Sequence, residues 1–270
     1  MTTRAPADAR PDHRAWVEQI MGMPVSIHVR GVGARGAHAR GTEVADAVER
    51  VFADLRAADT MFSPWQADSQ VSRLQRDELT LTDADPLVRE VHRLCETALE
   101  RTDGWFDAWN AVPDRPGVFD PTGLVKTWAV ARAARHLREL AVRTGIGYAV
   151  GAGGDVLTRP AADGAPWLIG IEDPRDRSVV LATLPAGDGG VATSGIAAKG
   201  AHILDPHTGE RVVGVLSATV AGPSLMWADV FATAAVAMGP AAVEWVTSLH
   251  GTSGLLVLAD GAVHRWGNPV

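Results

Sequence analysis

The most constraining feature of the sequence is a nearly continuous apolar stretch near its C-terminal end. From Leu225 to Met238 almost every residue is apolar, but the stretch carries one carboxylate, Asp229, and one hydroxyl a helical turn later, Thr233. An ionised carboxylate on a buried helix is costly unless a partner compensates it. Residues at i and i+4 share a helix face, so these two hard oxygens could converge on a cation such as Mg²⁺. The stretch is therefore the strongest indication of chemistry in the chain.

Structural roles for the same pair stay open on this stretch alone. Asp229 could lie at the start of the helix, where a carboxylate interacts favourably with the helix dipole. Thr233 could hydrogen-bond to a backbone carbonyl one turn earlier. Taken alone, the stretch favours these roles over a metal site.

Composition narrows the class of protein. The chain has 270 residues, 46% of them hydrophobic and 21% charged, which is typical of a globular protein. Its formal net charge of −7 argues against nucleic acid as the main partner. Lys126 and Lys199 are the two lysines, and Cys95 is the single cysteine, so no intramolecular disulfide is possible.

The sequence favours one soluble domain. Residues 1–14 are rich in Arg, Asp, Ala and Pro, which predicts a flexible tail, and they contain no apolar signal segment. The apolar stretch is interrupted by Asp229, by Gly239-Pro240 and by Glu244, so a buried helix is favoured over a membrane span. We expect residues 15–270 to form a single cytoplasmic domain.

Hydrophobic periodicity predicts a mixture of helices and strands. Helical patterns cover 42–59 with Thr42 as N-cap, a segment opened by Asp85-Pro86, 127–143, the stretch around Asp229, and 241–249. Strand patterns cover 24–30, 148–150, 156–158, 167–171, 179–184, 201–204, 212–220 and a terminal hairpin of 254–259 with 263–266. The two types do not alternate regularly as in βαβ units, which favours a layered α+β fold.

Several shorter motifs carry possible chemistry. Gly31 to Gly36 reads G-x-G-x-x-G, but a further loop precedes the next helix, so a dinucleotide fingerprint is disfavoured. Phe119-Asp120-Pro121-Thr122-Gly123-Leu124-Val125-Lys126 is a glycine-bearing turn leading into a helix, which suits a phosphate, although Lys126 could equally be a solvated side chain. Gly151-Ala152-Gly153-Gly154-Asp155 allows backbone to approach a ligand closely, or is a tight turn.

Two more motifs hold candidate side chains. Trp65 follows the turn residues Ser63 and Pro64 and offers a flat surface for a planar ring, although such a residue is more often a surface or core aromatic. His202 precedes the turn Asp205-Pro206-His207-Thr208-Gly209 and could act as a general base, or be an ordinary half-buried histidine.

In this order, the motifs resemble the ApbE family of flavin transferases. The similarity runs through Met21-Gly22-Met23, Phe62 to Leu74, Gly104 to Asp107, Asp120 to Lys126 and Gly153-Gly154-Asp155. It continues through Gly170 to Pro174, Ala192 to Gly195, His202 to Gly209 and Ala228 to Ala234. The resemblance covers nearly all of the chain after residue 20. It implies an α/β/α layered fold with mixed sheets and two closely fused subdomains.

The resemblance also implies an activity and a site. Such enzymes use FAD and a divalent cation, usually Mg²⁺, to attach FMN through a phosphodiester to a Thr of an acceptor flavoprotein, with release of AMP. By resemblance, Asp229, Thr233 and a carbonyl near Gly123 would bind the metal, and His202 and Asp229 would be catalytic. The FAD contacts would be Met21, Met23, Trp65, Asp120, Lys126, Gly154, Asp155 and Ser194.

Departures from the family pattern keep two alternatives open. Thr127 stands where the family usually has Gly, the segment between Ser194 and His202 is short, and Gln75 replaces a common Asn. The chain could therefore be an FAD pyrophosphatase that yields FMN and AMP, or a flavin-binding protein without activity. The presence of Asp229, Thr233 and His202 together argues against the last alternative.

Overall fold

The computed structural model describes residues 13–31, 37–112, 115–162, 164–195 and 203–267. Most of the predicted tail, residues 1–12, lies outside the described residues. Its last two residues, His13 and Arg14, were wrongly assigned to the tail, because they begin strand β1 (His13–Ile20). His13 pairs with Arg30 and Arg14 with Val29, so a continuous ladder orders this end of the domain.

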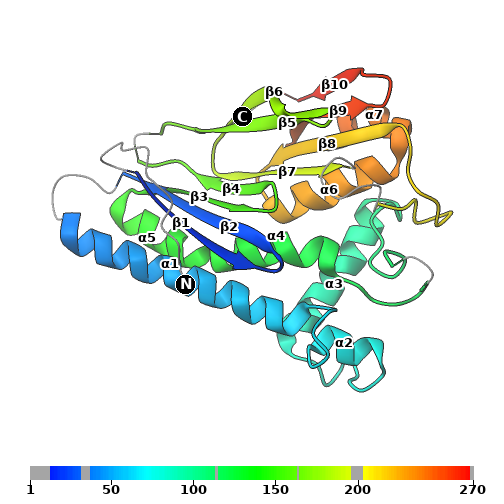
Figure 1. Ribbon diagram of the computed structural model, residues 1–270, viewed down its shortest axis with the longest axis horizontal. Helices are drawn as coiled ribbons and strands as arrows, with labels where there is room; N and C mark the ends of the chain where they lie inside the picture. The colour runs from blue at the N-terminus through cyan, green and yellow to red at the C-terminus, as the bar shows by residue number, and fades with distance from the viewer. Residues whose placement is uncertain (1–12, 32–36, 113–114, 163, 196–202, 268–270) are drawn as a thin grey trace.

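A single large sheet organises the molecule (Figure 1). It has eight strands in the order β1-β2-β3-β4-β7-β8-β9-β10, and every neighbouring pair is antiparallel. After β1, the strands are β2 (Met23–Arg30), β3 (Gly147–Ala152), β4 (Asp155–Arg159), β7 (Gly189–Gly195), β8 (Val215–Gly222), β9 (Ser253–Leu258) and β10 (Val263–Trp266). The predicted terminal hairpin is confirmed as β9 and β10.

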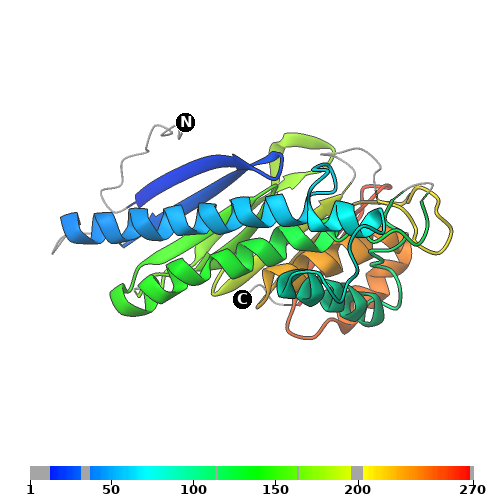
Figure 2. The same ribbon diagram turned by 90° about the horizontal axis from the view of Figure 1, so that it is seen from below.

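Four of the helices cover one face of this sheet (Figure 2). They are α1 (Ala37–Phe62), α4 (Thr122–Ala133), α5 (Arg135–Thr144) and α6 (Leu225–Ala237). Helix α6 packs on β7 and β8 and touches α4, while α1 packs on α4 and α5. Alternate strand residues such as Ile27, Val150 and Ala192 join the helices in one main core. This packing places Lys126 and Thr127, in the second turn of α4, against Asp229 of α6.

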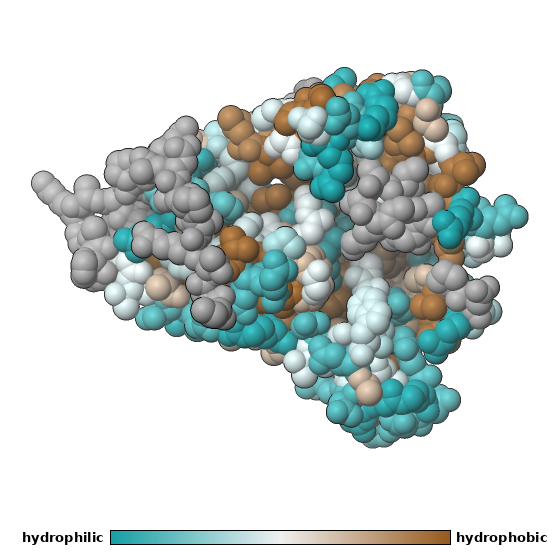
Figure 3. All heavy atoms as spheres, in the orientation of Figure 1, coloured by the Kyte–Doolittle hydropathy of each residue, from teal (hydrophilic) through white to brown (hydrophobic). Residues whose placement is uncertain are grey.

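A separate hairpin covers part of the opposite face. Strands β5 (Trp167–Asp173) and β6 (Asp176–Ala186) form a two-stranded antiparallel sheet. Ile171 and Ala186 from this hairpin share a second small core with Val191 of β7 and Leu255 and Val257 of β9. The hairpin therefore forms one wall over the end of β7 and β8. Its outward-facing Leu168 and Val180 stay exposed, and brown, hydrophobic atoms reach the surface in this region of Figure 3.

The α+β class and the layered arrangement are confirmed, with two differences in detail. The mixed sheets expected from the resemblance are antiparallel throughout the described residues, and tight hairpins join β1 to β2, β3 to β4, β5 to β6 and β9 to β10. Over β7 to β9 the layer opposite the helices is the β5–β6 hairpin rather than a helix layer. The division into two subdomains stays a prediction, since one main core spans the large sheet and its helices.

Helix ends were the weakest sequence predictions. Helix α1 begins at Ala37, so Thr42 lies inside it and is not its N-cap. The predicted helix 127–143 begins earlier, at Thr122, and is divided at Ala134 into α4 and α5. Residues 241–249 form only short turns of 3₁₀ and α-helix.

The other local predictions have mixed outcomes. Asp85 does cap α3 (Pro86–Arg101), while the short helix α2 (Gln70–Gln75) closes the turn-rich stretch after α1. The predicted strand 201–204 lies partly outside the described residues, and Leu204 forms only an isolated bridge with Arg211. Within the described chain, no helix has the length and apolarity needed to cross a bilayer.

Candidate active site

A cavity of about 970 Å³ opens where the sheet, the helices and the β5–β6 hairpin meet. Its size lies at the upper end of the range for small-molecule and cofactor sites. Most of the residues that the sequence singled out line it: Met21, Met23, Trp65, Asp120, Gly123, Lys126, Gly154, Ser194, Asp229 and Thr233. Segments that are far apart in the sequence therefore converge on one site.

Asp229 is compensated by two donors from α4. It is the fifth residue of α6, whose N-cap is Ser224, so the alternative placement at the helix start is wrong. The side chain is almost fully buried, and its Oδ2 atom accepts a hydrogen bond from the Thr127 hydroxyl at 3.0 Å. Lys126 Nζ lies 3.4 Å from the same oxygen. The buried carboxylate therefore already has a counter-charge from the protein.

Lys126 also joins Asp229 to a second buried carboxylate. Its Nζ forms an ion pair with Asp155 Oδ2, and the other oxygen of Asp155 accepts the Thr193 backbone N–H at 2.9 Å. Burial acts to lower the pKa of Lys126, but the carboxylates of Asp229 and Asp155 outweigh it and raise the pKa well above its usual range. Lys126 is therefore charged at neutral pH.

Asp155 has no exposed surface, and its ionisation is finely balanced. Burial and the charge of Asp229 raise the pKa of this carboxyl to about 7, while Lys126 and the Thr193 N–H act in the opposite direction. Two acids sharing one ammonium leave a net negative charge when both are ionised. The group formed by Lys126, Asp155 and Asp229, here called the buried triad, is therefore the electrostatic centre of the cavity.

Hydroxyl groups lie beside the buried triad. Thr233 is one turn after Asp229 on α6, and its Oγ1 lies 2.8 Å from Ser194 Oγ of β7 in a hydrogen bond. Its partner is thus a side chain across the helix–sheet interface, rather than the carbonyl of the preceding turn. Ser217 of β8 also lines the cavity, and its buried Oγ has no hydrogen-bond partner among the described residues. The site therefore offers several hard oxygens next to one carboxylate.

Two tight turns bring backbone to the cavity. Met21 and Gly22 connect β1 to β2 with φ of 54° and 70°, and Gly153 and Gly154 connect β3 to β4 with φ of 62° and 100°. Positive φ at both central residues is the pattern of the hairpin turn that matches strand twist. A Cβ at Gly153 would lie 2.8 Å from Met23 Sδ, so glycine permits the close packing of these turns. The G-G-D motif thus positions Asp155 at a strand start.

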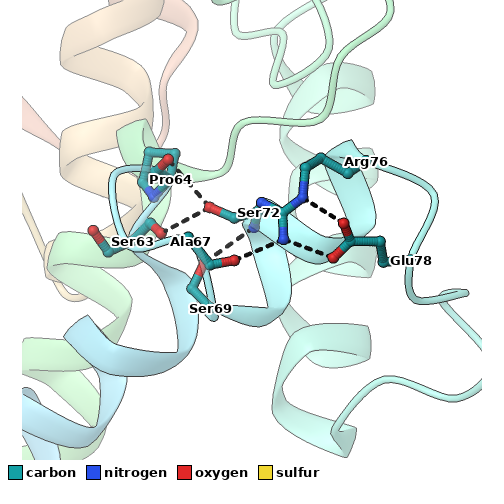
Figure 4. Close-up of polar contacts among 7 residues, drawn as sticks. All are labelled: Ser63, Pro64, Ala67, Ser69, Ser72, Arg76 and Glu78. Carbon is teal, nitrogen blue, oxygen red and sulfur yellow. Dashed lines mark hydrogen bonds and ion pairs between the residues drawn. The ribbon is translucent and has the colours of Figure 1, made fainter.

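Trp65 lies at the cavity mouth on a fixed loop. The residue is 83% exposed, yet it lines the cavity. Figure 4 shows how the loop is held: Ser72 Oγ donates to the Pro64 carbonyl at 3.1 Å, and Arg76 donates to the Ala67 carbonyl at 2.8 Å. Arg76 is in turn paired with Glu78. An exposed indole on a hydrogen-bonded loop is suited to stack on a planar ring.

The first turn of α4 carries two further candidates. Asp120 Oδ1 accepts the Thr122 N–H at 2.9 Å and so supports the helix start. Gly123 lines the cavity, and a Cβ there would lie 3.3 Å from the Phe106 ring. A carbonyl within a helix normally points along the axis toward the N–H of the residue four positions later, and not toward a ligand at the side. A metal-binding role for the carbonyl near Gly123 stays a prediction.

His202 and Lys199 lie outside the described residues. The adjoining Ile203 lines the cavity, and His207 packs edge-on against Trp105 at a centroid distance of 4.5 Å. The DPHTG turn is therefore attached beside the cavity, while the role of His202 stays a prediction.

Some site residues were missed by sequence reasoning. Thr127 was noted only as a departure from the family pattern, and Ser217 was not considered. The wall formed by Ile169, Gly170 and Arg177 of the β5–β6 hairpin was also missed. A signal existed for Ser217, since Ser217 and Thr219 are polar residues on one face of an otherwise apolar strand. No local pattern indicated the role of Thr127, because its partner, Asp229, is 102 positions away.

Comparison with known families identifies the group to which this architecture belongs. The family model described as the ApbE family matches residues 21–112 and 113–256. The chain belongs to the ApbE family. The residues that the family model matches include every described residue that lines the cavity, and the match confirms the resemblance seen in the motifs.

Curated ApbE relatives are distant in sequence. An FAD:protein FMN transferase from Klebsiella pneumoniae is 25% identical over 277 residues, which cover 82% of this chain and 79% of the relative. One from Escherichia coli K12 is 29% identical over 150 residues, covering 51% of this chain and 43% of that protein.

Solved ApbE structures share the fold over nearly the whole chain. The ApbE protein of Thermotoga maritima has a TM-score of 0.77 at 23% identity and covers 94% of this chain and 97% of its own. The flavin transferase ApbE of Vibrio cholerae has a TM-score of 0.73 at 21% identity, covering 95% and 97%. The backbone is therefore similar even where most side chains differ.

The donors in the cavity fit a hard cation that keeps few protein ligands. Among the described residues there is no group of three or more His, Cys, Asp or Glu arranged to hold a metal. Asp229 Oδ1 accepts no hydrogen bond from a described residue, and the hydroxyls of Thr233 and Ser194 are nearby oxygen donors. Mg²⁺ commonly uses one or two carboxylates and takes its other ligands from phosphate and water. The site therefore suits a cation that is bound together with a phosphate ligand.

Proposed function

We propose that the protein is an Mg²⁺-dependent FAD:protein FMN transferase. The observation that supports this most is the buried triad of Lys126, Asp155 and Asp229 in a cavity large enough for a dinucleotide, in a chain of the ApbE family. The acceptor is a flavoprotein with a Thr that receives FMN, and we place the reaction in the cytoplasm. The curated relatives carry the same activity in their names.

Different residues of the cavity bind different parts of FAD and the cation. Trp65 and the Met21 and Met23 turn bind the flavin end, while Lys126 and the Gly153-Gly154 turn face the pyrophosphate. Bound Mg²⁺ supplies positive charge that stabilises the phosphoryl group during transfer. Asp229 and Thr233 hold this cation, with the carbonyl near Gly123 as a further ligand. Asp120 and Ser194 complete the contacts to FAD, while Asp155, which has no exposed surface and does not line the cavity, acts through its ion pair with Lys126.

The reaction is a single substitution at the phosphorus atom of the FMN half of FAD. The acceptor Thr oxygen forms a bond to the phosphorus of the FMN half, and the bond from that phosphorus to the bridging oxygen breaks. AMP leaves with the bridging oxygen and its electron pair. His202 takes the proton of the Thr hydroxyl as general base.

One incubation separates this function from its alternatives. The purified protein is mixed with FAD, Mg²⁺ and an acceptor domain that bears a flavinylation-type Thr, and the products are followed by mass spectrometry. Covalent FMN on the acceptor together with AMP supports the transferase. Free FMN and AMP with an unmodified acceptor support an FAD pyrophosphatase. FAD that stays intact supports a binding protein without activity.

We predict that Mg²⁺ binds more tightly when FAD is present. The protein alone offers one carboxylate oxygen and a few hydroxyls, and Lys126 already lies 3.4 Å from Asp229. The FAD pyrophosphate adds anionic oxygen ligands that shift this balance. Isothermal titration should give at least a tenfold stronger Mg²⁺ affinity with FAD, on the order of 1.4 kcal/mol of coupling. Equal affinities with and without FAD would contradict the shared site.

A further inference from the structure

Thr127 is not among the residues that line the cavity, but it contacts Asp229, the acid that the proposed function assigns to the metal. The residue is fully buried on α4 and follows Lys126 directly in the sequence. Its hydroxyl lies 3.0 Å from Asp229 Oδ2 and 3.3 Å from the Leu124 carbonyl oxygen. A hydroxyl has one proton to donate, and the nearer, ionised acceptor gives the stronger hydrogen bond. The contact to Asp229 is therefore the main one.

Both donors to Asp229 meet the same oxygen atom. Lys126 Nζ and Thr127 Oγ1 lie 3.4 Å and 3.0 Å from Oδ2, and they come from adjacent residues of one helix. The other oxygen, Oδ1, accepts no hydrogen bond from a described residue. The carboxylate is thus held at one oxygen and left available at the other.

This asymmetry has a consequence for cation binding. The terminal torsion of an Asp side chain has a broad, roughly two-fold energy profile, so the carboxylate alone does not fix its own orientation. Contacts at Oδ2 remove that freedom before a ligand arrives. Groups that orient a metal-binding side chain commonly change metal affinity by about 10- to 100-fold when they are removed.

We propose that Thr127 is a positioning residue that, together with Lys126, holds Oδ2 of Asp229 and presents Oδ1 to the cation. This inference rests on the proposed function, since it assigns the cation to Asp229. It concerns the hydroxyl of Thr127 and not its methyl group. Thr127 acts through Asp229 and contacts neither the cation nor FAD.

The test compares Mn²⁺ affinity among matched variants, with free Mn²⁺ measured by electron paramagnetic resonance. Thr127→Val keeps the branched shape and removes the hydroxyl, and Thr127→Ser keeps the hydroxyl. Thr158→Val is the matched control, because Thr158 is a buried threonine with a hydroxyl hydrogen bond to the Gly187 carbonyl at 2.7 Å, on the wall of a different pocket. Asp229→Asn shows how much of the measured Mn²⁺ binding depends on this site.

We expect Thr127→Val to bind Mn²⁺ about 10-fold more weakly, with affinity restored in Thr127→Ser and unchanged in Thr158→Val. FAD affinity measured in EDTA by tryptophan fluorescence should stay the same in all three variants. A purely structural role would instead lower FAD affinity and thermal stability together, and that result would overturn the inference. Wild-type Mn²⁺ affinity in Thr127→Val, or equally weak binding in Thr127→Ser, would also overturn it.

The same experiment separates this inference from the proposed function. If Asp229→Asn loses Mn²⁺ binding while Thr127→Val does not, only the role of Thr127 is wrong. If wild-type protein shows no Mn²⁺ binding that depends on Asp229, the metal assignment fails and the inference fails with it. Transfer of FMN to the acceptor is measured independently of both results.

Discussion

Asp229→Asn should reduce FMN transfer by about 10²- to 10³-fold, the scale of losing one electrostatic contact to developing charge. Asparagine keeps the shape of the side chain but removes the charge that the cation needs. Lys126 keeps Asp155 as its partner, so the variant should stay folded. The initial rate of acceptor modification, measured by mass spectrometry with saturating FAD, checks this expectation.

A carboxylate outside the cavity provides the control for this substitution. Asp188 is 44% exposed at its side chain and is paired with Arg138 and Arg159. Exposed pairs contribute only about 0–1 kcal/mol, so Asp188→Asn should leave both the transfer rate and the thermal stability nearly unchanged. If Asp229→Asn transferred FMN at the wild-type rate, the metal assignment would be wrong.

The largest effect on stability should come from Lys126→Met. Lys126 is the shared partner of two carboxylates, and each of them is almost fully buried. Removing one partner of a buried ion pair leaves uncompensated charge and costs about 3–5 kcal/mol. We therefore expect Tm at neutral pH to fall by about 10 °C. Differential scanning calorimetry of the purified variant measures this change.

Arg56→Met is the matched control, because Arg56 also bridges two acids, Glu18 and Glu49, but lies at the surface. It should cost no more than about 1 kcal/mol. Lys126→Met leaves two neighbouring buried acids without a counter-charge, so added Mn²⁺ should restore part of the stability that this variant loses. Added Mn²⁺ should have little effect on the stability of Arg56→Met. A Lys126→Met protein as stable as the wild type would show that the buried triad does not need its ammonium group.

Much of the candidate site could be predicted from the sequence because its motifs lie at turns and helix starts. The Gly153-Gly154 turn and the N-terminal turn of α4 are local features, and the cavity brings them together as the motif order indicated. The apolar character of 225–238 correctly predicted a buried helix with a compensated carboxylate. These inferences depend on local chemistry, which a sequence records directly.

The partner of Asp229 could not be predicted in the same way. We expected its counter-charge to be a cation, whereas Lys126 and Thr127 reach it from a helix about 100 positions earlier. That contact depends on the packing of α4 against α6, which no local pattern specifies. The break at Ala134 and the early start of α1 were missed for a related reason, since tertiary packing overrides helix propensity at helix ends.

A crystal structure with FAD and Mn²⁺ would show whether one cavity holds both ligands, because the anomalous signal of manganese locates the cation without reference to activity. We expect the FAD pyrophosphate to lie between Lys126 and the Gly153-Gly154 turn. We also expect an anomalous peak bound by Asp229 Oδ1 and Thr233, with Thr127 still on Oδ2. A cation bound elsewhere, or FAD bound outside this cavity, would show that the proposed site is wrong.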